Sequence, residues 1–108
     1  MWYPTEIALD QLKMDTKTRV VIDKRPVLLL YDSDNVYALS DKCPHLGASL
    51  ALGTFENGVL TCAKHGAQID VKTGDVVEKA KIMFLKMPTK QARTYKTKVE
   101  KGKIFVNL

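Results

Sequence analysis

Apolar and β-branched residues recur in short runs through the middle of the chain, and clusters of polar turn residues separate these runs. The run at residues 27–31 consists of Val, three Leu and Tyr, which is typical of a strand buried on both faces. Residues 18–22 precede this run and residues 36–40 follow it, each across a polar turn. The pattern predicts an antiparallel meander of three strands.

A two-residue hairpin signal stands further along the chain at Asn57-Gly58, because both residue types tolerate a positive φ. It separates residues 54–56 from residues 59–61, so we expect these segments to pair as short antiparallel strands. Residues 100–103 predict a second hairpin turn near the end of the sequence. The other predicted strands are residues 68–71, 94–99 and 104–108.

The first seventeen residues carry a weaker pattern than the rest of the chain. Ile7, Leu9 and Leu12 are spaced to line one side of a short turn or helix, with Thr5 as its cap. Residues 76–93 show no regular period. The strand signals elsewhere predict an all-β fold, as a small antiparallel β-sandwich or partly closed barrel.

The length of 108 residues provides one hydrophobic core of modest size, so we expect a single domain spanning residues 1–108. A hydrophobic share of 45% and a charged share of 27% argue against a disordered chain. No segment approaches the roughly 20 apolar residues of a membrane span. Residues 1–6 lack the features of a signal peptide, so the sequence predicts a cytoplasmic protein that does not bind a membrane.

The formal net charge of +5 leaves two interpretations open. It indicates either a well-solvated outer surface or electrostatic attraction to an acidic partner. Nine of the 17 basic residues fall between Lys79 and Lys103, where Phe84 and Tyr95 are the only aromatic residues. Because single-stranded nucleic acid is bound on aromatic stacking platforms, we expect no nucleic-acid partner.

The only two cysteines and the only two histidines of the chain stand close together in pairs. Cys43 and His45 are spaced as C-x-H, sixteen residues follow, and Cys62 and His65 are spaced as C-x2-H. Thiolates and imidazoles in two short, paired segments are typical of a metal site. We expect these four residues to be the metal ligands.

Three interpretations compete for these four residues: a structural zinc site, a coincidence of structural residues, and a 2Fe–2S cluster. A structural zinc site accepts two Cys and two His, but zinc fingers usually pair Cys with Cys and His with His. A 2Fe–2S cluster with two thiolates on one iron and two imidazoles on the other explains the mixed pairs directly. A Cys43–Cys62 disulfide is rare in the cytosol and leaves both histidines unexplained. The spacing favours the cluster.

The two segments C-P-H-L-G-A-S-L and C-A-K-H-G-A-Q-I-D-V-K-T-G resemble the paired ligand boxes of soluble Rieske-type ferredoxins. The specific match covers about residues 41–74. The resemblance implies one 2Fe–2S cluster per chain, in a cluster-binding subdomain at approximately residues 41–75. It also implies that Cys43 and Cys62 bind a buried iron, and that His45 and His65 bind an exposed iron.

Two departures from the high-potential branch of the family bear on the reduction potential. That branch carries a second pair of cysteines, joined in a disulfide, where this chain has Ala48 and Lys64. It also carries a serine and a tyrosine that donate to the cluster sulfurs, where this chain has Ala67 and Ile69. With fewer donors to stabilise the reduced state, we expect a potential near the lower end of the Rieske range, about −150 mV.

The resemblance implies a one-electron carrier and not an enzyme, with no catalytic residues. A flavin- or iron–sulfur-containing reductase would supply the electrons, and an oxygenase or another terminal reductase would take them. Oxygenase catalytic subunits of the superfamily carry a separate mononuclear iron domain, for which 108 residues leave no room. The alternatives are a small Rieske subunit of a larger reductase, such as a nitrite reductase, and a zinc-stabilised binding module.

Overall fold

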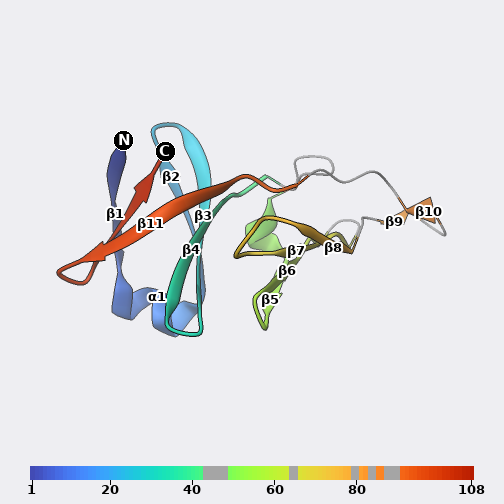
Figure 1. The fold of residues 1–108 in the computed structure, drawn as a ribbon, viewed down its shortest axis with the longest axis horizontal. Coiled ribbons are helices and arrows are strands. Elements are labelled where there is room, and N and C mark those ends of the chain that lie inside the picture. Colours follow the sequence, from blue (N-terminus) through green and yellow to red (C-terminus); the bar gives the residue numbers. More distant parts are fainter. Residues whose placement is uncertain (43–48, 64–65, 79–80, 83–84, 87–90) are drawn as a thin grey trace.

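Antiparallel β-strands make up most of the described chain and form a larger and a smaller sheet (Figure 1). The structure, a computed structural model, describes residues 1–42, 49–63, 66–78, 81–82, 85–86 and 91–108. The larger sheet has six strands in the order β1-β12-β11-β4-β3-β2. They are β1 (Trp2–Ala8), β2 (Lys17–Ile22), β3 (Arg25–Asp32), β4 (Asn35–Ser40), β11 (Thr94–Glu100) and β12 (Lys103–Asn107).

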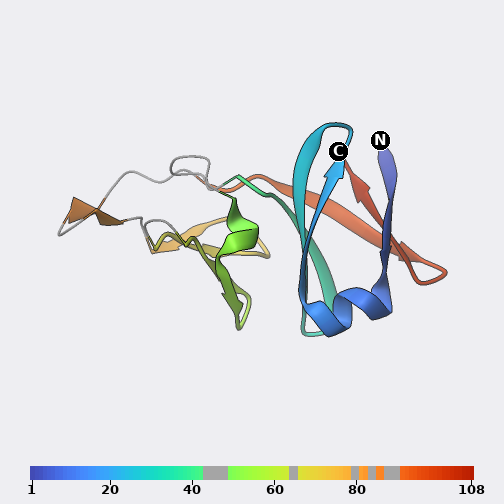
Figure 2. The same cartoon turned by 180° about the vertical axis from the view of Figure 1, so that it is seen from behind.

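The six-stranded sheet curls until its two edge strands face each other. A groove lined by residues 3–7 of β1 and residues 19–23 separates β1 from β2, so the sheet is a partly closed barrel. The α-helix α1 (Leu9–Asp15) connects these two edge strands at one end of the barrel (Figure 2). This architecture confirms the predicted all-β fold and the predicted meander of β2, β3 and β4.

The smaller sheet has four antiparallel strands in the order β5-β6-β7-β8. They are β5 (Thr54–Glu56), β6 (Val59–Thr61), β7 (Gln68–Asp70) and β8 (Val76–Glu78). The 3-10 helix η1 (Leu50–Leu52) precedes β5, and we call η1 with β5–β8 the small module. The module lies beside the barrel, next to the ends of β4 and β11 (Figures 1 and 2). A separate pair of short strands follows it, β9 (Lys81–Ile82) and β10 (Leu85–Lys86).

Strand β3 is buried on both faces, as the apolar run predicted. Val27 and Leu29 belong to the barrel core, which also contains Ile104 of β12. Leu28 and Leu30 point to the other side and belong to a second core, shared with the small module. All four β3 side chains are fully buried. Alternate residues of one strand therefore serve two cores, because successive side chains of a strand point to opposite faces.

Tight turns set the ends of the hairpin strands. In the described part of the chain, four hairpins turn on two consecutive residues with positive φ, the arrangement of a type I′ turn. At Asn57-Gly58 the φ values are 52° and 77°, and β5 and β6 have the bounds that the sequence predicted. The other three turns are Asp23-Lys24, Ser33-Asp34 and Lys101-Gly102.

Thr5 is not the helix cap that the sequence predicted. It lies in β1, is 4% exposed, and its hydroxyl donates to the carbonyl oxygen of Ile104 at 2.8 Å. Helix α1 instead follows Ala8, which makes no side-chain capping bond. The cap prediction was wrong because pairing with β12 extends β1 through Thr5 and uses its hydroxyl. Leu12 is fully buried, as expected for the inner side of the helix.

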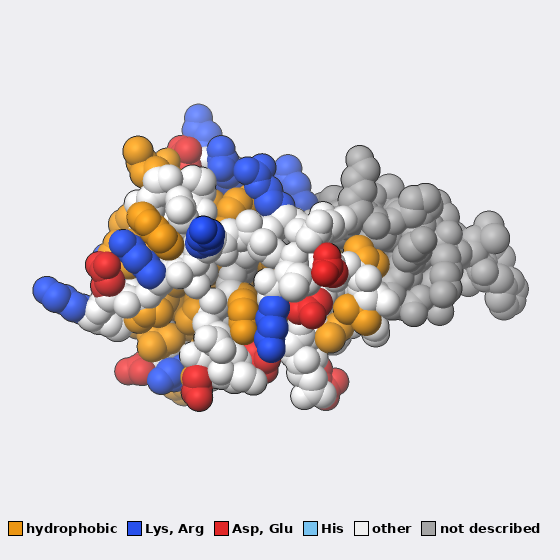
Figure 3. All heavy atoms as spheres, in the orientation of Figure 1, with side chains coloured by type: hydrophobic (Ala, Val, Ile, Leu, Met, Phe, Trp, Pro, Cys, Tyr) orange, Lys and Arg blue, Asp and Glu red, His pale blue; other side chains and the backbone are white. Residues whose placement is uncertain are grey.

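Charged side chains of both signs lie among hydrophobic and uncharged ones on the face shown in Figure 3. Lys and Arg gather along its upper rim. Among the described residues, three basic side chains pack on aromatic rings: Lys98 Nζ lies 4.7 Å from the ring centre of Trp2, the Arg93 guanidinium lies 5.6 Å from that of Tyr95, and Lys13 Nζ lies 5.9 Å from that of Tyr31. In the described part of the chain, no helix is long and apolar enough to cross a membrane.

Candidate metal centre

The structure describes one of the four predicted ligands in detail. Cys62 follows the last residue of β6, and its side chain is 3% exposed. Cys43, His45 and His65 lie outside the described residues. Among the residues that are described, no three His, Cys, Asp or Glu side chains lie together. The complete ligand set therefore remains a prediction.

Apolar side chains surround Cys62. It belongs to the core between β3 and the small module, together with Leu60, Ala67 and Ile69, each of which is fully buried. The thiol is not part of a disulfide. A buried cysteine in an apolar wall fits the predicted ligand of a buried iron, because such surroundings limit solvent access to a metal site.

The predicted second ligand loop is closed at its base. The Cys62 N–H donates to the Ala67 carbonyl oxygen at 2.8 Å, and the Gly66 N–H donates to the Cys62 carbonyl oxygen at 3.2 Å. Gly66 has a φ of 75°, which residues with a side chain rarely adopt. These bonds continue the pairing of β6 with β7. The loop that carries Cys62 and His65 is thus the tip of the β6–β7 hairpin.

The first ligand pair was predicted in a segment from Asp41 to about Gly53, of which residues 43–48 lie outside the described residues; the chain on either side of them meets at a single place. Lys42 and Ser49 form an isolated antiparallel bridge, and the Leu50 N–H donates to the Asp41 carbonyl oxygen at 2.7 Å. Backbone hydrogen bonds therefore hold the two ends of this segment side by side.

The small module connects the bases of the two loops. After the first loop the chain passes through η1 into β5, which pairs with β6, so Thr54 lies opposite Thr61, the residue before Cys62. The approach is close: a Cβ atom on Gly53 would lie 2.0 Å from the Thr61 carbonyl oxygen. Leu50 and Cys62 also pack in the same core. The fold thus brings together the two segments that carry the predicted ligands.

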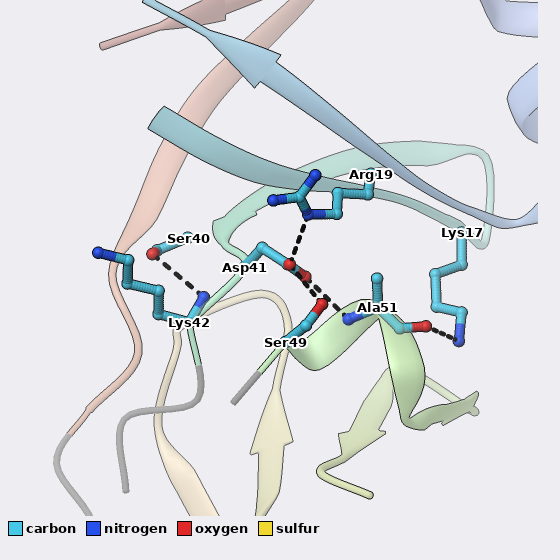
Figure 4. A network of polar contacts seen from close by, with 7 residues as sticks. All are labelled: Lys17, Arg19, Ser40, Asp41, Lys42, Ser49 and Ala51. Carbon is cyan, nitrogen blue, oxygen red and sulfur yellow. Dashed lines mark hydrogen bonds and ion pairs between the residues drawn. The ribbon is translucent and has the colours of Figure 1, made fainter. Parts of the chain in front are cut away.

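A polar network at the base of the first loop was not predicted from the sequence. Asp41 is 2% exposed, and its carboxylate accepts hydrogen bonds from Arg19 and Ser49 and from the backbone of Ala51 (Figure 4). In the sequence, Lys17 and Arg19 lie on one face of an otherwise β-branched strand, which is also the pattern of ordinary exposed strand residues and does not indicate their partners.

Comparisons with known proteins identify the family. A model of the family described as the Rieske [2Fe-2S] domain matches residues 1–88 of the chain. The anthranilate 1,2-dioxygenase ferredoxin subunit of Burkholderia cepacia is 29% identical over 107 residues, which cover 99% of this chain and 92% of that protein. Apoptosis-inducing factor 3 of Homo sapiens is 35% identical over 80 residues, which cover 74% of this chain but 12% of that longer protein.

Structures of known proteins share the fold over nearly the whole chain. The ferredoxin of carbazole 1,9a-dioxygenase from Nocardioides aromaticivorans IC177 has a TM-score of 0.76 and 32% identity, and the match covers 95% of each chain. A chain in a complex of reduced oxygenase and oxidised ferredoxin of carbazole 1,9a-dioxygenase has a TM-score of 0.79 and 27% identity. That match covers 97% of this chain and 91% of that one.

These findings confirm three of the predictions made from the sequence: the family, the all-β fold class and the 2Fe–2S cofactor. The family description names a 2Fe–2S cluster, the cofactor that the spacing of Cys and His favoured over zinc. The spacing of Cys and His, the buried cysteine and the match over residues 1–88 all agree. The chain belongs to the Rieske [2Fe-2S] domain family.

Proposed function

We propose that this chain is a ferredoxin that carries single electrons from a reductase to an oxygenase. The observation that carries the proposal is the likeness to ferredoxins of dioxygenase systems, which extends over most of both chains. One such ferredoxin forms a complex with its oxygenase. When bound, a 2Fe–2S cluster takes up and releases one electron at a time. The chain acts as a carrier and not as a catalyst.

We propose that Cys43 and Cys62 hold one iron and that His45 and His65 hold the other. Two described features support this assignment. The Cys62 side chain is buried in an apolar core, as the thiolate ligand of a buried iron would be. The bases of the segments that carry the other three residues are closed by backbone hydrogen bonds in the same module. Reduced thiols are typical of the cytosol, so we also propose a cytoplasmic location.

The residues around Cys62 shape the polarity of the site. Leu60, Ala67 and Ile69 exclude water from the thiol side, and none of these side chains has a donor to offer a sulfur atom. Hydrogen bonds to the sulfurs of an iron–sulfur site are one determinant of its reduction potential. This apolar wall supports the expectation of a low potential.

Chemical analysis of the purified protein tests the proposed function. We expect two iron and two labile sulfide atoms per chain, a red-brown colour, and an EPR signal of the Rieske type after one-electron reduction. Titration should require one electron per chain. A colourless protein after anaerobic reconstitution with iron and sulfide, or one that binds only zinc, would contradict the proposal.

Ala67→Ser is expected to raise the reduction potential. A serine at this buried position would supply the hydroxyl donor that the high-potential branch has. One added hydrogen bond of roughly 1 kcal/mol corresponds to about 40 mV for a one-electron couple. Protein-film voltammetry would measure the shift. Ala63→Ser is the matched control, since it adds the same hydroxyl at an exposed position of the same loop. Equal potentials for Ala67→Ser and wild type would refute the expectation.

A further inference from the structure

We propose that Lys17, Arg19 and Asp41 form a clamp that positions the first ligand loop against the barrel. The loop comprises residues 43–48, and the inference rests on the proposed function, in which Cys43 and His45 hold the cluster. The three clamp residues are positioning residues, because they act on the loop through the segments on either side of it.

Asp41 is the centre of the clamp (Figure 4). One carboxylate oxygen, Oδ2, accepts from Arg19 Nε at 2.9 Å and from Ser49 Oγ at 2.5 Å, while Oδ1 accepts from the Ala51 N–H at 2.8 Å. The backbone of Asp41 is bonded on both sides as well. Its N–H donates to the Pro26 carbonyl oxygen at 3.0 Å, and its carbonyl oxygen accepts from the Leu50 N–H. The residue therefore links β3 of the barrel to the segment that follows the loop.

Lys17 forms the second half of the clamp. Its Nζ donates to the carbonyl oxygens of Ala51 and Gly53 at 2.7 and 2.5 Å. These carbonyls lie at the end of η1, where the helix leaves oxygens without an internal partner. Lys17 and Arg19 are two residues apart on β2 and therefore project from the same face of this strand. One edge strand of the barrel thus holds the chain both before and after the loop.

The carboxylate at the centre of the clamp is buried, so its contact with Arg19 differs from an ordinary surface ion pair. The Asp41 side chain is 3% exposed, although the Arg19 side chain is 48% exposed. Loss of the carboxylate would leave the partly buried Ser49 hydroxyl and Ala51 N–H without this partner, which is costly. Among the described residues, the buried polar or charged ones are Asp41 and Thr5. Thr5 lies in the barrel, on β1, and bonds Ile104, so it has no contact with the loop.

A fixed loop base matters for a metal site. Supporting contacts hold the ligands in the geometry that the metal requires, and their loss typically weakens metal binding about 10- to 100-fold. The bonds of Asp41 and Lys17 hold the chain at both ends of residues 43–48. Without them, the loop would sample positions in which its two ligands no longer meet those of the second loop.

The test compares the holoprotein with Asp41→Asn and Lys17→Met. Asp41→Asn keeps the shape but removes the charge that Arg19 faces, and Lys17→Met keeps the apolar stem but removes both bonds to the carbonyls. Thr5→Val is the matched control, because it removes an equally buried hydroxyl from the barrel. For each protein, the rate of cluster loss to an iron chelator, the EPR line shape and the thermal unfolding curve are measured.

We expect Asp41→Asn and Lys17→Met to lose the cluster about tenfold faster than wild type and to show altered EPR line shapes. Thr5→Val should lower the melting temperature and leave both the rate and the line shape unchanged. Wild-type rates and spectra in both clamp variants would overturn the clamp, as would a Thr5→Val variant that loses its cluster equally fast. If Asp41→Asn fails to fold, the results for Lys17→Met alone test the clamp.

The outcomes also separate the clamp from the proposed function. A wild-type protein without a cluster would overturn the proposed function and the clamp together. An intact wild type with unaffected variants would overturn the clamp alone.

Discussion

Cys62→Ala is expected to yield a colourless protein that contains neither iron nor labile sulfide. The side chain is 3% exposed at the end of β6, so no solvent ligand can easily replace the thiolate from outside. Alanine fills part of the same apolar space. Cys62 does not belong to the barrel core, so the β-strand signal of the barrel in the circular dichroism spectrum should be unchanged. Iron and sulfide analysis with visible and EPR spectroscopy would measure the loss.

Thr61→Ala serves as the matched control for this substitution. It truncates the neighbouring, partly buried side chain without removing a thiol, and it should keep the cluster. A Cys62→Ala protein with the wild-type iron content and spectrum would show that the ligand assignment is wrong, even though the chain belongs to the Rieske family.

Gly74→Ala should produce the largest loss of stability among substitutions at the described glycines with positive φ. Gly74 has a φ of 80°, and a Cβ there would lie 2.3 Å from the Ala92 carbonyl oxygen. The Ala92 N–H donates to the Gly74 carbonyl oxygen at 2.8 Å, so the small module and the segment before β11 touch at this point. The strained φ and the backbone clash together should cost about 3 kcal/mol.

Gly102→Ala separates the two contributions to that cost. Gly102 has a φ of 77°, but nothing lies within 4 Å of a Cβ built on it. Its substitution should cost about 1 kcal/mol, from the left-handed conformation alone. Thermal unfolding should then show a decrease of roughly 4–8 °C for Gly102→Ala and two to three times as much for Gly74→Ala. Equal decreases would show that the chain relaxes around the contact with Ala92.

Local signals explain which parts of the fold could be predicted from the sequence. The turn Asn57-Gly58 determines where β5 ends and where β6 begins, because the residues that permit a positive φ are adjacent in the chain. Strand β1 had no such signal. It contains Pro4 and pairs with β12, about a hundred residues away, so its existence depends on a distant partner. Strand β8 was missed for a related reason, since its pairing with β7 contains an irregularity.

The same distinction between local sequence signals and distant contacts explains which parts of the candidate site could be predicted. Cys43, His45, Cys62 and His65 could be proposed as ligands because the chain contains no other Cys or His and because their spacing is that of the family. The clamp could not be proposed. Lys17 and Arg19 have the sequence pattern of ordinary exposed strand residues, and their partners on either side of the loop lie more than twenty residues away. Only the packing of the module against the barrel brings these charges together.

The two-faced burial of β3 has a consequence for how the protein unfolds. If the small module detached, Leu28 and Leu30 would meet water while Val27 and Leu29 stayed enclosed, and melting of the barrel would expose all four. The second core therefore cannot outlast the barrel, because β3 supplies side chains to both. This dependence of the small module on the barrel supports the proposal that residues 1–108 form a single domain.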